Sequence, residues 1–395
     1  MRPSTSPNCD EAVVIAATAA SLAVTRLHLT NFRSYAMAGL SVSGVSVVLA
    51  GPNGAGKTNI LDAISLLAPG RGLRGAKLGE HVRKGPAATS VVEGGEALWA
   101  VAATVNRGDT PYDIGTGLTV GPNGDEKRHV RLNGVEAKGS ADLGDVVQML
   151  WLTPAMDRLF TEAASGRRRF LDRLVLGFDP GHARLATRYE TAMRERARLL
   201  KYGPRDPAWL DGLENEMAEA GVAIAQARAA TVERLNLALS ARGSAGAFPA
   251  AALTLTGESF DSADALRSAL AASRLSDAQA GRTLVGPHVT DLAARHTAKR
   301  ADAQHCSTGE QKALLISIIL AEARELARAR GGMAPLLLLD EIAAHLDGVR
   351  RAALFEEIAD LGAQAWMTGT DLSLFSTARA QIFAVEDGVF TEQRP

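Results

Sequence analysis

A phosphate-binding loop constrains this chain more than any other feature. Residues 49–58 read Leu-Ala-Gly-Pro-Asn-Gly-Ala-Gly-Lys-Thr behind an apolar run that is typical of a buried strand. The glycines let backbone N–H groups converge on phosphate oxygens, Lys57 is expected to reach the terminal phosphates, and Thr58 to bind Mg²⁺. A helix from 59 to 67 follows, with its N-terminus facing the anion. The predicted nucleotide site comprises Gly51, Pro52, Asn53, Gly54, Ala55, Gly56, Lys57, Thr58 and Asn59.

A partial copy of this loop occurs at residues 121–124, which read Gly-Pro-Asn-Gly. Asp125 and Glu126 follow, so two carboxylates stand where phosphate would lie, and neither Gly-Lys-Thr nor an apolar helix comes after them. The copy is therefore predicted to be a turn.

An apolar strand that ends in two carboxylates supplies the second half of the site. Residues 335–339 read Pro-Leu-Leu-Leu-Leu, and Asp340 and Glu341 follow. Ligands collect at the C-terminal ends of buried parallel strands. Asp340 suits the Mg²⁺ position, directly or through water, and Glu341 suits a general base that orients the attacking water. Lys57 and Glu341 are the expected catalytic residues, although a core strand with a capping acid would give the same pattern.

The segment 307–311, Ser-Thr-Gly-Glu-Gln, precedes a strongly apolar helix at 312–322. Ser307 with Glu310 three residues later forms a capping box, which by itself would explain the pattern. The other interpretation is the signature motif of an ABC-type ATPase, which contacts the γ-phosphate of ATP held by another subunit. The residues expected to make that contact are Ser307, Gly309 and Gln311.

Two further segments favour the ABC interpretation. Residues 344–347, Ala-His-Leu-Asp, follow the carboxylate pair in the manner of a D-loop. Thr368 and Thr370 stand where transporter ATPases place a switch histidine, and either hydroxyl is a candidate sensor of the γ-phosphate.

The remaining pattern predicts strands and helices in separate blocks. Short antiparallel strands are expected at 97–105, 112–120 and 127–132, behind a first strand at 24–29. Helical segments rich in Arg, Ala, Leu and Glu run from 154 to about 242, interrupted by glycine and proline. A strand at 251–256, a helix near 261–272 and a strand at 283–285 then lead back to the nucleotide domain.

These blocks predict an α/β protein: a P-loop ABC-type ATPase head with an antiparallel β subdomain and a second, mainly helical arm domain. The head is expected to comprise residues 23–153 and 281–395, and the arm residues 154–280. Residues 1–22 are expected to be a disordered or loosely helical N-terminal extension. They are not expected to be a signal peptide, because Asp10 and Glu11 stand where a signal peptide carries positive charge.

Composition limits the partners and the compartment. The chain has 395 residues and a net charge of −1, from 43 Lys+Arg and 44 Asp+Glu, so nucleic-acid binding must come from local basic patches. Cys9 and Cys306 are the only cysteines, which excludes a disulfide framework and fits a reducing compartment. No run reaches the roughly 18–20 apolar residues that span a bilayer. We expect a cytoplasmic protein with no membrane partner.

Taken in order, the motifs resemble the RecF family of the ABC/SMC ATPase superfamily over roughly residues 23–390. Besides the ATP motifs, the resemblance rests on Asn-Phe-Arg-Ser-Tyr at 31–35, Gly-Arg-Arg-Arg-Phe-Leu-Asp at 166–172 and Val-Gly-Pro-His at 285–288. Two segments depart from the family pattern. Val289 and Thr290 follow the Gly-Pro-His segment where an arginine is usual, and residues 310–312 read Glu-Gln-Lys where many relatives have Gln-Gln-Arg.

The resemblance implies a recombination mediator that binds DNA, forms an ATP-dependent homodimer and hydrolyses ATP slowly. It also implies cooperation with RecO and RecR in loading recombinase at gapped DNA, with a role in replication-linked repair and SOS induction. ATP and Mg²⁺ are the implied cofactors.

Other ATPase classes fit less well. An ABC transporter ATPase subunit carries a much smaller insertion between the phosphate loop and the signature motif. An SMC-like chromosome-structural ATPase needs long heptad arms and a hinge, which the interrupted segment 154–242 does not provide. A P-loop kinase has no use for the segments 307–311 and 344–347.

Two basic segments are candidates for DNA contact. The first, here named the basic loop, is residues 70–85. Its one acidic residue is Glu80, and its basic residues are Arg71, Arg74, Lys77, Arg83 and Lys84. The second is the arm from 167 to 201, beginning with Arg167, Arg168 and Arg169, for which a solvated helix face with internal ion pairs is the alternative. Neither segment interleaves aromatic platforms, so contacts to phosphates that are independent of sequence are expected.

Overall fold

The computed structural model describes residues 22–84, 97–121, 123–203, 206–241, 246–344, 346–386 and 388–393. Leu22 is buried in strand β1 (Leu22–Phe32), so it belongs to the head and not to the expected extension. Residues 1–21, the remainder of that extension, lie outside the described residues.

A six-stranded sheet forms the centre of the head, in the order β15-β14-β3-β13-β12-β8. Its strands are β3 (Ser46–Ala50), β8 (Met149–Leu152), β12 (Leu336–Leu339), β13 (Ala365–Gly369), β14 (Ala380–Glu386) and β15 (Val389–Gln393). All pairs from β14 to β8 are parallel, and only β15 runs antiparallel. Parallel order brings the C-terminal ends of β3, β13 and β12 to one edge, so the segments after these strands lie close together.

Alternating apolar side chains place this sheet between two hydrophobic cores. On β3, Val47 and Leu49 face one core while Val48 and Ala50 face the other. The first core is completed by α1 (Lys57–Ser65) and the second sheet. The other core is completed by α2 (Ala164–Phe178), α7 (Thr308–Ala329) and α8 (Gly348–Asp360). Helices α1 and α7 therefore pack on opposite faces of the central sheet.

The antiparallel β subdomain has the order β2-β1-β4-β5-β6-β7. Besides β1 it contains β2 (Tyr35–Ser41), β4 (Ala97–Arg107), β5 (Thr110–Val120), β6 (Glu126–Leu132) and β7 (Val135–Glu136). The three strands predicted between 97 and 132 are confirmed. The partial copy of the phosphate loop is a turn, as predicted, in which the Gly124 N–H donates to the Gly121 carbonyl over 2.9 Å.

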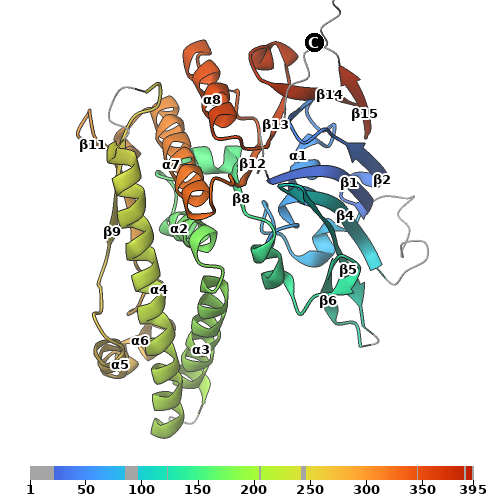
Figure 1. The fold of residues 1–395 in the computed structure, drawn as a ribbon. Coiled ribbons are helices and arrows are strands. Elements are labelled where there is room, and N and C mark those ends of the chain that lie inside the picture. Colours follow the sequence, from blue (N-terminus) through green and yellow to red (C-terminus); the bar gives the residue numbers. More distant parts are fainter. Residues whose placement is uncertain are drawn as a thin grey trace, which may run out of the picture.

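The arm extends away from the head as a helical hairpin (Figure 1). It contains α3 (His182–Tyr202), α4 (Pro207–Ala241), α5 (Ala263–Ala272) and α6 (Arg274–Ala280). The 35 residues of α4 span about 50 Å at 1.5 Å per residue. The first half of α4 packs in a separate arm core, while Leu235 joins the core around α7. The hydrophobic core thus crosses the expected division at residue 154.

A fully buried arginine lies at the centre of the arm. Arg196 donates from Nε to Glu214 over 2.8 Å and from Nη1 to Asp277 over 2.6 Å. Its Nη2 donates to the Leu270 carbonyl over 2.7 Å. One guanidinium therefore joins α3, α4, α5 and α6.

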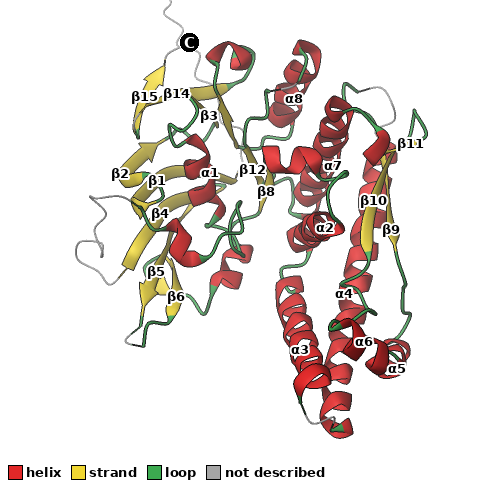
Figure 2. Ribbon diagram, turned by 180° about the vertical axis from the view of Figure 1, so that it is seen from behind, coloured by secondary structure: helices red, strands yellow, loops and turns green. Residues whose placement is uncertain are grey.

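A three-stranded sheet in the order β11-β10-β9 lies beside α4 (Figure 2). Its strands are β9 (Ala251–Thr256), β10 (Asp291–His296) and β11 (Ala301–Asp302). The strand predicted at 251–256 and the helix predicted near 261–272 are confirmed. The strand predicted at 283–285 is wrong, because its backbone groups hydrogen-bond to side chains and not to a neighbouring strand. The Leu284 N–H donates to Asp277 over 2.9 Å, and the Thr283 carbonyl lies 2.9 Å from His288 Nε2.

None of the described helices is both long enough and apolar enough to cross a bilayer.

Candidate functional site

The phosphate loop connects β3 to α1, and two of its glycines are required by close approaches. A Cβ on Gly51 would lie 2.2 Å from the Val385 carbonyl oxygen of β14. Gly56 has φ 101° and directly precedes α1, and a Cβ there would lie 2.6 Å from the Tyr35 hydroxyl. Backbone blocks a side chain at Gly51, and at Gly56 the Tyr35 side chain and the positive φ disfavour one, so glycine is required at both positions.

Lys57 closes the loop on itself. Its Nζ donates to the carbonyls of Gly51 over 2.6 Å and Pro52 over 2.8 Å, and the side chain is buried. Burial lowers the pKa of Lys57, while the charges of Glu341 and Asp340 oppose that shift. A phosphate in the loop would replace two neutral acceptors with charged ones, which bind an ammonium group more strongly.

A chain of hydrogen bonds links the phosphate loop to the end of β12. Thr58 Oγ1 lies 2.9 Å and 3.1 Å from the two carboxylate oxygens of Asp340. Thr368 Oγ1, at the end of β13, donates to the same carboxylate over 2.7 Å. The parallel strand order predicted this convergence. The set offers hydroxyl and carboxylate oxygens, the donors that Mg²⁺ prefers when waters and phosphates complete its shell, so these residues fit the ion.

Glu341 has a strained backbone. Its φ of +50° lies in the left-handed region, which costs a non-glycine residue of order 1–3 kcal/mol and persists only where surroundings fix it. One such contact is the Glu341 N–H, which donates to Thr368 Oγ1 over 2.8 Å. Thr368 thus contacts both members of the carboxylate pair. This agrees with its selection as a candidate sensor, but a role in sensing phosphate stays a prediction.

The signature segment begins α7 with the predicted capping box. The Glu310 N–H donates to Ser307 Oγ over 3.4 Å, and the Ser307 N–H donates to Glu310 over 3.0 Å. Hydrogen bonds from Lys299 and from the Ser307 backbone lower the pKa of Glu310 to about 2. Ser307 remains exposed and Gly309 half-exposed, so both are accessible to a ligand on a second molecule.

Gln311 differs from its neighbours in the signature segment. Its side chain is buried, and Nε2 donates to the Cys306 carbonyl over 2.9 Å. The expected contact between Gln311 and ATP is therefore not supported, because its amide holds the start of α7 within its own chain. In the D-loop segment, position 345 lies outside the described residues. Asp347 caps α8 by accepting from the Arg350 N–H over 2.8 Å.

Sequence comparison identifies the family. The model described as the RecF/RecN/SMC N terminal domain matches residues 23–391. The DNA replication and repair protein RecF of Mesorhizobium japonicum is 49% identical over 376 residues, which cover 92% of this chain and 96% of that protein. The protein of the same description from Rhizobium leguminosarum bv. trifolii is 48% identical over 381 residues, 94% and 99% of the two chains. The chain belongs to the RecF family.

Solved structures show the same fold. A RecF structure described as the recombination mediator protein RecF-ATPrS in the RecFOR pathway superposes with a TM-score of 0.80 at 23% identity, covering 95% of this chain and 100% of that one. The Smc head domain of Pyrococcus furiosus superposes with a TM-score of 0.51 at 17% identity, over 94% and 96% of the chains. The RecF family fold is thus an ABC/SMC-type ATPase head, as the motif order predicted.

A buried carboxylate that the sequence reading missed connects α1 to the family's Asn-Phe-Arg-Ser-Tyr segment. Asp62 lies one helical turn after Thr58, and Arg33 Nε donates to it over 3.0 Å. Burial raises the pKa of Asp62, but the His81 imidazole, whose Nδ1 lies 3.5 Å from the carboxylate, and the charge of Arg33 outweigh it, so the net shift is downward. An aspartate inside an otherwise apolar helix was the available signal. Asn59 also contacts this segment, donating to Ser34 Oγ over 2.9 Å.

The basic loop rests on the same helix. The Leu73 N–H donates to Ser65 Oγ over 2.6 Å, and the Arg74 N–H donates to Asp62 over 3.4 Å. The side chains of Arg71, Arg74 and Lys77 are exposed, and none takes part in an ion pair within residues 22–84 or the other described segments. The loop therefore presents Arg71, Arg74 and Lys77 to solvent and is attached to the helix that begins at the phosphate loop.

Most arm arginines donate hydrogen bonds to other groups of the same chain. Arg167 donates from Nε and Nη2 to Asp291 over 3.0 Å and 2.7 Å, and from Nη1 to the carbonyls of Leu159 and Glu162. These contacts join α2 to β10 and occupy the donors of Arg167, so a DNA contact by Arg167 stays a prediction. Arg168 is half-buried and Arg169 exposed, so a DNA contact by either stays a prediction.

Two segments of the RecF family resemblance, residues 166–172 and 285–288, meet at Arg228. Its Nε and Nη2 donate to Asp172 over 2.8 Å and 2.9 Å, and its Nη1 donates to the Pro287 carbonyl over 2.5 Å. Burial raises the pKa of Asp172, but hydrogen bonds from His182 and Arg228 outweigh it and lower the pKa overall. Close to this joint, His288 Nδ1 lies 2.8 Å from the Tyr189 hydroxyl. The Gly-Pro-His segment therefore has a structural role at the base of the arm.

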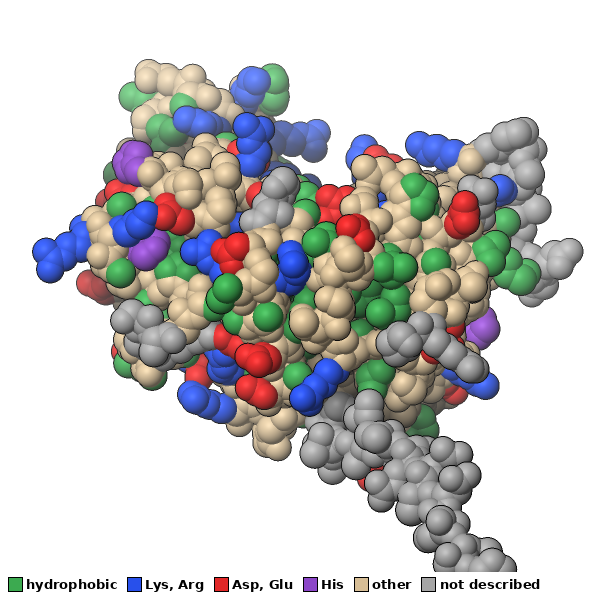
Figure 3. Space-filling model, turned by 90° about the horizontal axis from the view of Figure 1, so that it is seen from above, with side chains coloured by type: hydrophobic (Ala, Val, Ile, Leu, Met, Phe, Trp, Pro, Cys, Tyr) green, Lys and Arg blue, Asp and Glu red, His purple; other side chains and the backbone are tan. Residues whose placement is uncertain are grey.

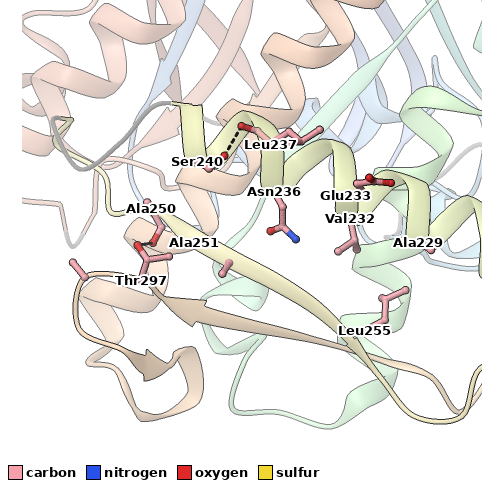
Figure 4. Close-up of a pocket in the computed structure, with 12 residues that line it drawn as sticks. Ala229, Val232, Glu233, Asn236, Leu237, Ser240, Ala250, Ala251, Leu255 and Thr297 are labelled. Carbon is pink, nitrogen blue, oxygen red and sulfur yellow. Dashed lines mark hydrogen bonds between the residues drawn. The ribbon is translucent and has the colours of Figure 1, made fainter.

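A cleft of about 950 Å³ lies away from the phosphate loop, between α4 and β9 (Figure 4). Asn236 projects across it from α4, donating to the Leu253 carbonyl over 2.8 Å and accepting from the Leu253 N–H over 2.8 Å. This amide covers the free edge of β9 as a neighbouring strand would. None of the phosphate-loop residues lines the cleft, and we assign it no part in nucleotide binding.

Proposed function

We propose that this chain is an ATP-dependent, DNA-binding recombination mediator that acts at gapped DNA and helps RecO and RecR to load recombinase. Its place of action would be the cytoplasmic nucleoid, in replication-linked repair and SOS induction. The observation that carries the proposal is the hydrogen-bonded chain Thr58–Asp340–Thr368 in a member of the RecF family. It joins the phosphate loop to the carboxylate strand, as an ATP switch requires.

In the proposed site, Lys57 leaves the two loop carbonyls for the terminal phosphates, and the N–H groups of residues 51–56 bind phosphate oxygens. Thr58 and Asp340 would hold Mg²⁺ in place of their present hydrogen bonds. Bound Mg²⁺-ATP supplies the phosphoanhydride bond, and the ion neutralises charge on the phosphate oxygens. The Glu341 carboxylate accepts the proton of the attacking water.

Two copies would close over two ATP molecules. Helices α1 and α7 pack on opposite faces of the central sheet, so the phosphate loop and the signature segment of one chain are separated by that sheet. The exposed Ser307 hydroxyl and Gly309 would instead complete the ATP site of a partner copy. Hydrolysis would then be slow, would need the dimer, and would be stimulated when DNA favours closure.

Sizing the protein by light scattering, with and without ATP and gapped DNA, tests the proposal. The parent protein should dimerise with ATP, and Glu341→Gln should bind ATP, hydrolyse it about a hundredfold more slowly and accumulate as a dimer on gapped DNA. Ser307→Arg should bind ATP and stay monomeric. An ATP-loaded parent protein that remains monomeric at every concentration, with or without DNA, would refute the proposal.

A further inference from the structure

A buried lysine on the signature helix contacts the turn that carries the proposed base. Lys312 lies in the first turns of α7 and is 5% exposed. Its Nζ donates to the Ala344 carbonyl over 2.9 Å and lies 3.5 Å from the Glu341 carbonyl oxygen. A carboxylate oxygen of Asp157 is also 3.5 Å away. The ammonium group therefore brings together three segments that are far apart in sequence.

Each of these segments belongs to the catalytic edge of the central sheet. Asp157 lies in the short helix Pro154–Arg158 that follows β8. Strand β8 pairs with β12, and the Asp340 N–H donates to the Leu152 carbonyl over 2.9 Å, so the segments after both strands leave the sheet side by side. Lys312 reaches them from the helix that begins at Ser307.

The cost of burying this ammonium group indicates that its contacts matter. Removing a lysine from water costs several kcal/mol unless its donors find partners. Here two partners are carbonyls of the turn after β12, in which the Ala344 N–H donates to the Glu341 carbonyl over 3.2 Å. The strained Glu341 is thus fixed from both ends, by Thr368 at its N–H and by Lys312 at its carbonyl.

We propose that Lys312 is a positioning residue that couples the signature motif of its own chain to Glu341 of the same chain. The inference rests on the proposed function. Because Ser307 would engage ATP held by the partner, movement of α7 on closure would be passed by Lys312 to the turn that aims Glu341 at this chain's own ATP. Hydrolysis at one site would then depend on occupation of the other.

The first test separates binding from turnover. Lys312→Met keeps the length and the apolar stem but removes the donor. It should leave ATP affinity and KM within about twofold and lower kcat at least tenfold, which corresponds to about 1.4 kcal/mol in the barrier. Lys312→Arg, which restores a long cationic donor, should recover most of kcat. Arg328→Met is the matched control, because Arg328 lies on the same helix with its side chain 72% exposed, and it should match the parent protein.

The second test uses mixed dimers purified through two different tags. When Lys312→Met and Glu341→Gln lie on the same subunit opposite a parent subunit, the remaining Glu341 keeps its own Lys312, and turnover should equal that of a parent/Glu341→Gln dimer. When the two changes lie on opposite subunits, the only active base lacks its lysine, and turnover should fall at least fivefold. If Lys312→Met fails to fold, Lys312→Gln replaces it in both pairings.

Equal turnover of the two pairings, or a Lys312→Met kcat equal to that of the parent, would overturn the inference. Loss of ATP affinity in folded Lys312→Met would also overturn it, since a positioning role predicts unchanged binding. These outcomes differ from failure of the proposed function, in which the parent protein itself neither dimerises with ATP nor hydrolyses it.

Discussion

Neutralising the basic loop should reduce DNA affinity in proportion to the number of phosphates it contacts. The change is the triple variant Arg71→Gln, Arg74→Gln and Lys77→Gln. All three side chains are exposed and none has an ion-pair partner in the described part of the chain, so the substitutions disturb no internal contact. The loop itself stays attached through the backbone, since the Leu73 N–H still reaches Ser65 Oγ over 2.6 Å.

The size of the effect follows from counterion release. Each lost phosphate contact makes the negative slope of log Kobs against log[salt] shallower by about 0.9. At 0.1 M salt this lowers the affinity about eightfold. If all three side chains contact phosphate, the slope should become shallower by about 2.7 and the affinity should fall by about 500-fold, equally for unrelated DNA sequences. Fluorescence anisotropy of labelled duplex and gapped oligonucleotides over about 50–200 mM salt measures both quantities, and ATP affinity should be unchanged.

A matched triple variant on the arm provides the control and the competing hypothesis. Arg169, Arg184 and Arg198 are also exposed and form no ion pair among the described residues. Their replacement by glutamine removes the same charge from α2 and α3. The net charge of −1 and the mixture of basic and acidic side chains on the face in Figure 3 give no reason to expect a long-range effect of charge alone. If the arm variant loses affinity and salt dependence while the loop variant keeps both, the reasoning is refuted and DNA binds along the arm.

Three further outcomes are expected. Lys57→Ala should abolish ATP binding measured by calorimetry, and unchanged affinity would exclude the loop as the nucleotide site. Arg196→Met should lower the free energy of unfolding by about 3–5 kcal/mol, because it leaves buried carboxylates without their cation. Arg188→Met should have a much smaller effect, because the Arg188 side chain is 42% exposed and its ion pairs are screened by water. Equal losses of stability for the two variants in urea denaturation would contradict this. Asp172→Asn should destabilise the protein near neutral pH. Burial raises the pKa of Asp172, but the neighbouring imidazole and guanidinium outweigh burial and lower it, so the difference in unfolding free energy between parent and variant should narrow as the pH falls below about 4. A constant difference across that pH range would show that the charge is not responsible.

The parts of the site that are contiguous in sequence were predictable. The phosphate loop, its strand and its helix are fixed by local backbone requirements, and the apolar run before Asp340 reads as a buried parallel strand without further information. Strand β9 was predicted with the bounds that the structure has. The strand predicted at 283–285 failed because Asp277 and His288, which local pattern does not consider, hydrogen-bond its backbone.

The contacts that join distant segments could not be predicted. Thr368 and Asp340 are brought together only by the parallel pairing of β12 with β13. Lys312 reads in sequence as one more polar residue at a helix start, and its burial becomes visible only when the turn after β12 is in place. The inward direction of Gln311 could not be predicted for a similar reason, because the rotation of α7 is set by packing, and its contact with ATP stays a prediction.

The two basic segments show why a count of charges misleads in one case and is informative in the other. On the arm, the acids that neutralise the arginines lie on other elements: Asp291 of β10 pairs with Arg167, and Asp277 of α6 pairs with Arg196. A local excess of arginine therefore says little about free charge, since an acid far away in sequence is folded against it. The basic loop is short and lies on α1, whose one acid in the described structure, Asp62, is already bound to Arg33. Arg71, Arg74 and Lys77 keep no ion-pair partner among the described residues, which is why we predict that DNA phosphates bind there.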